Sequence, residues 1–73
     1  MVTNVIYDRE SLKRDLKTKR VIDLGISMEV CSKQIGVSKP TLSRIENGSM
    51  PDLITFFKII GWLGSDAKKY INY

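Results

Sequence analysis

Apolar residues recur along most of this chain at spacings of three and four, the period of an amphipathic helix. Leu12 and Leu16 stand one turn apart in a stretch from residue 10 to about residue 24, where arginine and lysine fill many of the other positions. Glycine at position 25 ends this stretch, because glycine is favoured directly after a helix. The pattern predicts a basic first helix that stops at Gly25.

Two shorter helices are expected next, each opened by a serine. Ser27 precedes the first and Ser38 the second, and serine is a preferred N-cap residue. Gly36 separates the two helices, and Pro40 falls in the first turn of the second, where proline costs little. The pair Asn47-Gly48 ends this third helix, because the alternating apolar pattern of a hairpin does not flank it.

The rest of the chain contains its most apolar stretch. Asp52 is placed to cap a fourth helix from Leu53 to Leu63, whose broad apolar stripe makes it the main contributor to the core. Ser65 is placed to cap a short final helix, although residues 70–73 alone also suit an edge strand. At the other end, residues 2–7 are rich in β-branched side chains and predict a short strand or an arm.

Composition limits the size and class of the fold. The chain has 73 residues, of which 42% are apolar and 27% charged, ordinary values for a small globular protein. We therefore expect one compact all-α domain of four to five helices over residues 1–73, with an arm at 1–9 and a C-terminal dimer segment at 65–73. A core this small supplies only about 3 to 5 kcal/mol, so a homodimer is expected to add support.

Several classes of protein are disfavoured. The lone Cys31 has no partner for an internal disulfide or a zinc site, no signal-peptide core is visible, and no apolar run is long enough to cross a bilayer. These features predict a cytoplasmic protein with no membrane partner. The chain has no histidine, the commonest general base, and no nucleophile-elbow or phosphate-cradling glycine motif. We expect no enzyme, cofactor, metal or small-molecule ligand.

Charge and helical phase together indicate a partner. The formal net charge of +4 favours a polyanion. On a helical wheel of about 100° per residue, Thr41, Leu42 and Ile45 lie on one side of the third helix. A polar outer side is typical of any surface helix, but this one carries hydroxyl, guanidinium and amide groups suited to a DNA major groove. The residues on this polar side of the third helix are Pro40, Ser43, Arg44 and Asn47.

The order of these segments is more specific than any one of them. Two short helices joined by a glycine turn, each with a serine N-cap, form the helix-turn-helix arrangement, here at residues 27–47. The chain closely resembles the Cro/phage-repressor type helix-turn-helix family, also called XRE, over about residues 12 to 64. The resemblance is carried by Leu24-Gly25-Ile26-Ser27, Ile35-Gly36-Val37-Ser38-Lys39-Pro40-Thr41-Leu42-Ser43-Arg44-Ile45-Glu46-Asn47-Gly48, Pro51-Asp52-Leu53 and Trp62-Leu63-Gly64.

The resemblance implies a lambda-repressor-like DNA-binding fold, with a third helix that reads base edges and a twofold dimer that spans half-sites about 34 Å apart. Arg44 is expected to contact the O6 and N7 atoms of a guanine. Met28 departs from the family pattern, so a phosphate contact near it is either missing or made by Ser27 or Lys33. By position, the expected DNA-binding residues are Ser27, Ser38, Lys39, Pro40, Thr41, Ser43, Arg44 and Asn47.

Two structural roles also come from the resemblance. Arg20 stands five residues before Gly25, whereas the family typically leaves four, so one residue has been added. If it lies between the first two helices, Arg20 keeps the family phase and pairs with Glu46 at the foot of the reading helix; a solvated Arg20 is the alternative. Family dimers commonly associate through the C-terminal end, so the expected dimer interface is Trp62, Tyr70, Ile71 and Tyr73.

The expected function is a sequence-specific transcription regulator of double-stranded DNA, a repressor of phage or mobile-element type that binds a palindromic operator as a homodimer in the nucleoid. The alternative is an antitoxin with a toxin partner, which also regulates its own operon. Residues 6–7 ahead of Leu12, with Leu53 and residues 55–59, are similar to HipB-type antitoxins. A third possibility is a basic bundle with no role on DNA.

Overall fold

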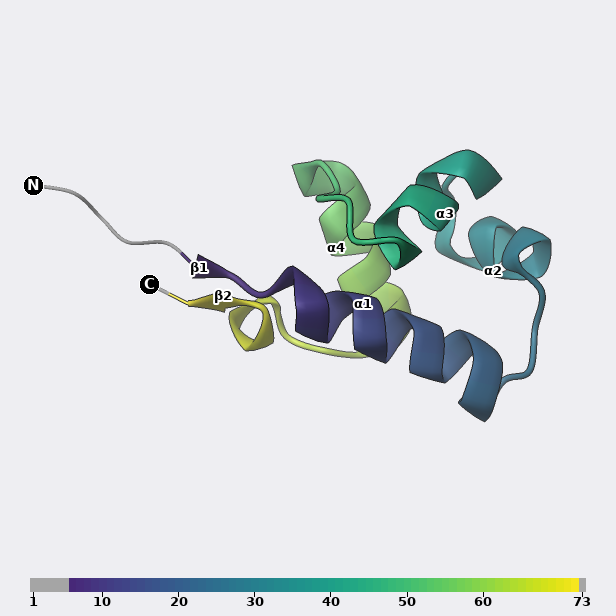
Figure 1. The fold of residues 1–73 in the computed structure, drawn as a ribbon, viewed down its shortest axis with the longest axis horizontal. Helices are drawn as coiled ribbons and strands as arrows, with labels where there is room; N and C mark the ends of the chain where they lie inside the picture. Colours follow the sequence, from purple (N-terminus) through teal and green to yellow (C-terminus); the bar gives the residue numbers. More distant parts are fainter. Residues whose placement is uncertain (1–5, 73) are drawn as a thin grey trace, which may run out of the picture.

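The computed structural model describes residues 6–72, and most of them form helices. The four α-helices are α1 (Arg9–Lys17), α2 (Met28–Ile35), α3 (Lys39–Glu46) and α4 (Leu53–Leu63). A π-helix, η1 (Thr18–Asp23), continues α1, and a 3-10 helix, η2 (Ala67–Lys69), follows α4. Figure 1 shows α1 and η1 along one side of the molecule, with α2, α3 and the first turn of α4 on the other. The expected all-α fold is confirmed.

Each α-helix begins where an acidic or hydroxyl side chain caps it. The capping oxygen accepts a hydrogen bond from the backbone amide three residues further on, at distances between 2.7 and 3.3 Å. Such a bond satisfies an amide that has no partner inside the helix. The caps predicted for the second, third and fourth helices are therefore confirmed. The capping residues are Asp8, Ser27, Ser38 and Asp52.

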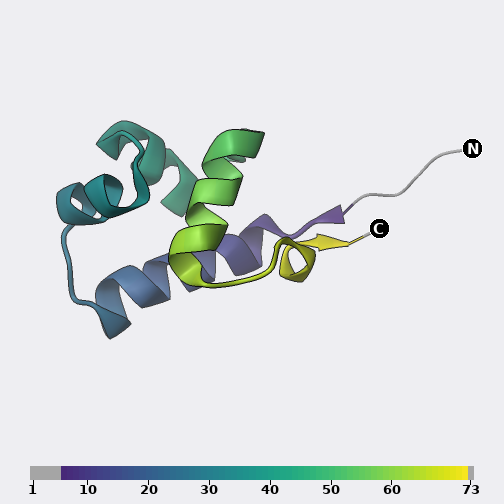
Figure 2. The ribbon, with the colours of Figure 1, turned by 180° about the vertical axis from the view of Figure 1, so that it is seen from behind.

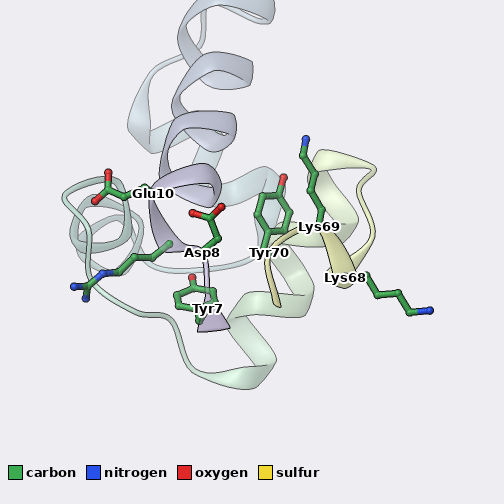
Figure 3. Close-up of a pocket in the computed structure, with 7 residues that line it drawn as sticks. Tyr7, Asp8, Glu10, Lys68, Lys69 and Tyr70 are labelled. Atoms are coloured by element: carbon green, nitrogen blue, oxygen red, sulfur yellow. The ribbon is translucent and has the colours of Figure 1, made fainter. Parts of the chain in front are cut away.

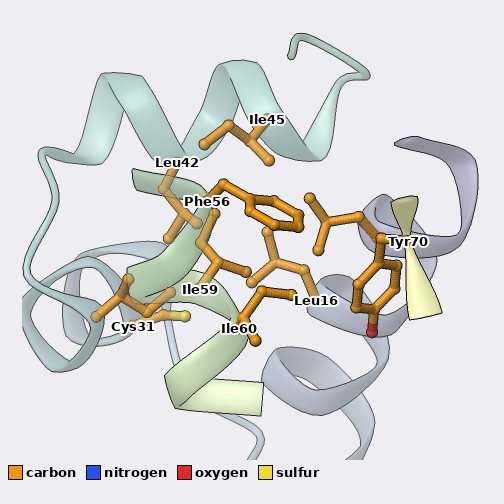
Figure 4. Packing of buried hydrophobic residues seen from close by; sticks show 10 residues of the cluster. Leu16, Cys31, Leu42, Ile45, Phe56, Ile59, Ile60 and Tyr70 are labelled. Carbon is orange, nitrogen blue, oxygen red and sulfur yellow. The ribbon is translucent and has the colours of Figure 1, made fainter. Parts of the chain in front are cut away.

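The core lies where the four α-helices meet. Figure 4 shows Phe56 of α4 facing Ile45 and Leu42 of α3 and Leu16 of α1. The apolar positions at helical spacing are thus the buried sides of their helices. The buried hydrophobic residues are Leu12, Leu16, Cys31, Ile35, Leu42, Ile45, Phe56, Ile59, Ile60 and Tyr70.

The first helix does not stay α-helical to residue 24 as predicted. From Thr18 the backbone continues as η1, in which the amide of Leu24 donates to the carbonyl of Lys19 at 2.9 Å. Such a bond spans one residue more than an α-helical bond. Residues Thr18–Asp23 therefore follow a wider helical path than an α-helix, whereas α1 upstream stays α-helical.

The final helix predicted from Ser65 does not form. Asp66 caps the short η2 instead, and the chain then extends into strand β2 (Ile71–Asn72), which pairs antiparallel with strand β1 (Ile6–Tyr7). The edge-strand alternative is right here, because pairing with a segment at the other end of the chain, Ile6 with Asn72 and Tyr7 with Ile71, supplies hydrogen bonds that local propensity cannot reveal. Of the arm predicted over residues 1–9, residues 1–5 lie outside the described residues, and Arg9 already belongs to α1.

The terminal segments lie side by side at one end of the molecule (Figures 1 and 2). The amide of Asp8 donates to the carbonyl of Tyr70 at 2.6 Å, which extends the pairing of β1 and β2. Within residues 6–72, no helix has the length and apolar character needed to span a bilayer.

Candidate nucleic-acid interface

The turn between α2 and α3 determines how α3 is presented. Gly36 ends α2 with φ at +90°, a left-handed conformation that glycine adopts at little cost. Nothing lies within 4 Å of the position that a Cβ atom would take there, so the requirement for glycine is conformational and not steric. Ser38 then caps α3, and Pro40 occupies its first turn. The local sequence thus specifies both the turn and the start of α3.

One side of α3 is anchored in the core and the other is exposed. Leu42 and Ile45 are 0% and 3% exposed, as the helical wheel predicts. Thr41, which the wheel places with them, is half-buried at the boundary. The outward side chains of the helix and its N-cap, of which Ser43 is half-buried and the rest exposed, are Ser38, Lys39, Pro40, Ser43, Arg44 and Asn47.

Two of these side chains and Thr41 at the boundary form a hydrogen-bonded row along α3. Ser38 Oγ donates to Thr41 Oγ1 at 2.7 Å, and Arg44 Nη2 donates to the same oxygen at 3.4 Å. The guanidinium has five N–H donors, and this contact uses one of them. We call Ser38, Thr41 and Arg44 the α3 row. It holds an arginine at the outer edge of the helix, with donors left to bind an acceptor on another molecule.

Two further contacts fix the ends of α3. Asn47 Nδ2 donates to the carbonyl of Ser43 at 2.9 Å. Lys58 Nζ, on α4, donates to the carbonyl of Gly36 at 3.0 Å and so places a positive charge at the turn before α3. Sequence reasoning missed Lys58, because its partner lies 22 residues away and no local spacing could indicate the contact.

Arg20 forms hydrogen bonds to Glu46 on the buried side of α3. Its Nε and Nη2 atoms donate to Oε2 and Oε1 of Glu46 at 2.6 and 2.9 Å, and Nη1 donates to the carbonyl of Ile26 at 3.2 Å. The two side chains are only 14% and 6% exposed. The hydrogen bonds to Glu46 raise the pKa of Arg20 although burial opposes this. The pair that the resemblance implied is present, and it joins η1 to α3.

A comparison with known families agrees with this geometry. A helix-turn-helix family model matches residues 16–66, more than half of the chain. The chain belongs to the XRE-type helix-turn-helix family. It is therefore a DNA-binding transcription regulator of XRE type. Searches of curated proteins and of solved structures found no match.

In this XRE-type regulator, the start of α2 also faces outward. Ser27 is exposed, and its Oγ accepts a hydrogen bond from the amide of Val30 at 3.2 Å. Met28 packs partly against the core, while Lys33 is exposed. The serine and lysine expected to replace a missing phosphate contact are therefore both at the surface.

The C-terminal residues expected to form a dimer interface are largely used within the chain. Tyr70 is 1% exposed, and its hydroxyl donates to Asp15 Oδ2 at 2.6 Å; its assignment to an interface is therefore wrong for this conformation. Trp62 is half-buried, donates from Nε1 to Gln34 at 3.0 Å and lies beneath the Lys19 ammonium. Ile71 packs partly against the core, and Tyr73 lies outside the described residues.

A pocket of about 470 Å³ lies at the end where the termini meet. Figure 3 shows Asp8 between Tyr7 and Tyr70, while the Glu10 and Lys68 side chains point away. The Asp8 carboxylate already accepts from Ser11, and that bond lowers its pKa. Burial raises the pKa of Tyr7 to about 12. Among the described residues no cluster of carboxylates, cysteines or histidines suits a metal ion.

Proposed function

We propose that this XRE-type regulator is a repressor that binds a palindromic operator as a homodimer. The observation that carries the proposal is the α3 row, whose Ser38 and Arg44 are exposed on a helix. The opposite side of that helix is held in the core by Leu42, Ile45 and the pair of Arg20 with Glu46. A rigid helix with a polar outer side fits the width of a DNA major groove. Occupation of an operator is by itself enough to block a polymerase.

Arg44 is the residue assigned to base recognition. Its guanidinium can donate two parallel hydrogen bonds to O6 and N7 of a guanine, which is worth roughly 1 to 3 kcal/mol of discrimination against other bases. Ser38, Lys39, Pro40 and Thr41 surround it at the N-terminal half of α3. Ser27, Ser43 and Asn47 are assigned to the phosphate backbone, where contacts fix the register of the protein without reading sequence.

The first experiment is selection of preferred sequences from random duplexes, carried out with the wild type and with Arg44→Ala. The wild type is expected to select an inverted repeat and to prefer it about 10³-fold over random duplex. Arg44→Ala should lose preference at one base pair in each half-site. Arg14→Ala is the matched control, since it removes the same charge from an exposed position of α1. An unchanged sequence profile for Arg44→Ala would contradict its assignment.

The phosphate contacts give a different result in the same assay. Asn47→Ala should weaken binding to all duplexes by a similar factor, because a backbone contact carries no sequence information. For the wild type, affinity should fall steeply as salt rises, since binding releases counterions from DNA. A salt-independent affinity, or equal affinity for operator and random duplex, would support a basic bundle without a DNA role.

An antitoxin remains the second candidate, because η1 and its C-cap Leu24 expose apolar side chains that could contact a protein. Val21, Ile22 and Leu24 are 44%, 74% and 45% exposed. Copurification from the native host distinguishes the two roles. A stoichiometric second protein retained at high salt would favour the antitoxin, whereas a regulator alone is expected to elute as a homo-oligomer.

A further inference from the structure

The Thr41 hydroxyl joins the N-cap of α3 to the arginine assigned to base recognition. Its Oγ1 atom accepts one hydrogen bond from Ser38 Oγ at 2.7 Å and another from Arg44 Nη2 at 3.4 Å. A hydroxyl oxygen has two lone pairs, and these bonds use both of them. While the α3 row is intact, Thr41 therefore cannot accept a hydrogen bond from the amino group of adenine or cytosine.

Thr41 is held in place by the residues around it. Its backbone amide donates to Ser38 Oγ at 3.3 Å, its side chain is half-buried, and the next residue, Leu42, is wholly buried. A threonine in a helix chooses between two side-chain rotamers, and the bond from Ser38 selects one of them. The serine that begins α3 thus also fixes the position of the Thr41 oxygen.

Arg44, in contrast, is exposed and has few contacts. Among residues 6–72, the Thr41 hydroxyl is the only side-chain group to which Arg44 donates a hydrogen bond. An arginine side chain has large rotational freedom, which a bidentate contact with a base removes on binding. A contact that orders the guanidinium in the free protein reduces this entropic cost.

A charged acceptor lies close to the same arginine. Thr41 and Arg44 line a hollow of about 230 Å³, and Asp52 lines it as well. The Asp52 carboxylate accepts a hydrogen bond from the amide of Thr55 at 2.7 Å, and its bonds with Thr55 lower its pKa, so it is ionised at neutral pH. Without the contact to Thr41, the guanidinium has this carboxylate as an alternative partner, and turning towards it removes the guanidinium from the α3 row.

We propose that Thr41 is a positioning residue that sets base specificity through Arg44 and makes no base-specific contact of its own. The family resemblance implied direct contact of Thr41 with DNA, whereas the geometry directs its hydroxyl to Ser38 and Arg44. The inference rests on the proposed function, since it requires that Arg44 reads a base pair.

The test compares the full-length wild type with Thr41→Val and Thr41→Ser in selection from random duplexes. Valine keeps the shape of threonine without the hydroxyl, whereas serine keeps the hydroxyl; circular dichroism checks that both variants fold. At the base pair identified by Arg44→Ala, Thr41→Val should reduce the preference for guanine about 2- to 10-fold, the effect of ordering one long side chain on binding. Preferences at all other base pairs should stay unchanged, and Thr41→Ser should keep the wild-type profile.

A double-mutant cycle distinguishes positioning from direct contact. Once Arg44→Ala has removed the guanidinium, adding Thr41→Val should change nothing further, because the two residues act through one contact. An equal effect of Thr41→Val with and without Arg44 shows that Thr41 binds DNA itself and overturns the proposal. Equal weakening of all duplexes by Thr41→Val, or a Thr41→Ser profile identical to that of Thr41→Val, also overturns it.

A second measurement uses the free protein. The NMR order parameter of the Arg44 Nε–H group should be lower in Thr41→Val than in the wild type and in Thr41→Ser, because the guanidinium then moves on the fast timescale that this parameter reports. An unchanged order parameter in Thr41→Val overturns the proposal without reference to DNA.

The two proposals fail in different ways. If the wild type selects no preferred sequence, or if Arg44→Ala leaves the profile unchanged, the proposed function loses its reading residue and the role of Thr41 fails with it. A guanine preference that depends on Arg44 and not on Thr41 overturns only the role of Thr41.

Discussion

At the scale of single residues, the chemistry presented by α3 depends on side chains on the opposite, buried side of the helix. Glu46 is almost wholly buried directly behind the exposed end of the helix. A buried carboxylate is tolerated only when it is paired and hydrogen-bonded, and Arg20 supplies both donors. The orientation of α3 and the burial of Glu46 therefore depend on one arginine in η1.

Arg20→Met should destabilise the protein strongly, because it leaves Glu46 buried without a partner. A loss of about 3 to 5 kcal/mol in the free energy of unfolding is expected from chemical denaturation. The double variant Arg20→Met with Glu46→Leu should recover most of that loss, since both charges are then removed. Equal destabilisation of the single and double variants would show that the pair acts through something other than its charge.

Cys31 should react slowly with a thiol reagent in the native state. Its side chain is 0% exposed, and burial raises the pKa of its thiol, so little reactive thiolate is present. The rate of modification should follow the rate of opening and become fast in denaturant. Rapid modification of the folded protein would instead support a redox role for this cysteine.

At the scale of elements, η1 links α1 to α2 by a wider helical turn than an α-helix would make. The π-helical turn lets Leu12 and Leu16 stay in the core while Arg20 still reaches Glu46. The cost is that the turn exposes Val21, Ile22 and Leu24. Local propensity favours an α-helix throughout this stretch, so the π-helix follows from fixed contacts on both sides of it.

Deletion of Ile22 should therefore be tolerated. The shortened segment is expected to run as an α-helix to Gly25, with the free energy of unfolding unchanged or higher. Deletion of Lys13 is the control, because it rotates Leu12 relative to Leu16 by one residue inside α1 and removes one of them from the core, at a cost of about 2 to 5 kcal/mol. If both deletions destabilise equally, η1 is not the site that absorbs the extra residue.

At the scale of the whole molecule, long-range polar contacts tie the C-terminal segment to α1. Asp15 on α1 accepts hydrogen bonds from the Tyr70 hydroxyl at 2.6 Å and pairs with Lys69 at 2.9 Å. Burial acts to raise the pKa of Asp15, but these bonds outweigh it, and the pKa lies below the ordinary value of 3.8. The carboxylate therefore stabilises the fold only while it is ionised.

The free energy of unfolding should decrease as the pH falls below about 4, the ordinary pKa of an aspartate. A lowered pKa in the folded state means that the stabilisation is complete above the unfolded value and disappears as pH falls through the folded value. Asp15→Asn should be less stable at pH 7 and lose less on acidification. Lys69→Met should shift the acid transition to higher pH. Identical acid transitions in all three proteins would contradict the role of Asp15.

Much of the candidate site was predictable because its determinants are local. The serine caps, the glycine turn and the apolar spacing of α3 lie within a few residues of one another, where capping and helical periodicity act. The members of the α3 row also stand three residues apart, but the helical wheel placed Thr41 with the buried side, and only the structure shows it bonded to Ser38 and Arg44. Contacts such as Lys58 with Gly36 or Trp62 with Gln34 join distant segments, and no spacing in the chain indicates them.

By itself, the amino-acid sequence determined the four α-helices, the helix-turn-helix and the exposed arginine of α3, because short-range hydrogen bonds and one-sided burial control these features. Only the tertiary structure decided that residues 18–23 form a π-helix, that the chain ends in a β-ladder with Tyr70 in the core, and which apolar surface remains exposed on α4. Those outcomes depend on which distant groups meet. A side chain's burial is settled by its neighbours in space, and residues far apart in the chain supply most of them here.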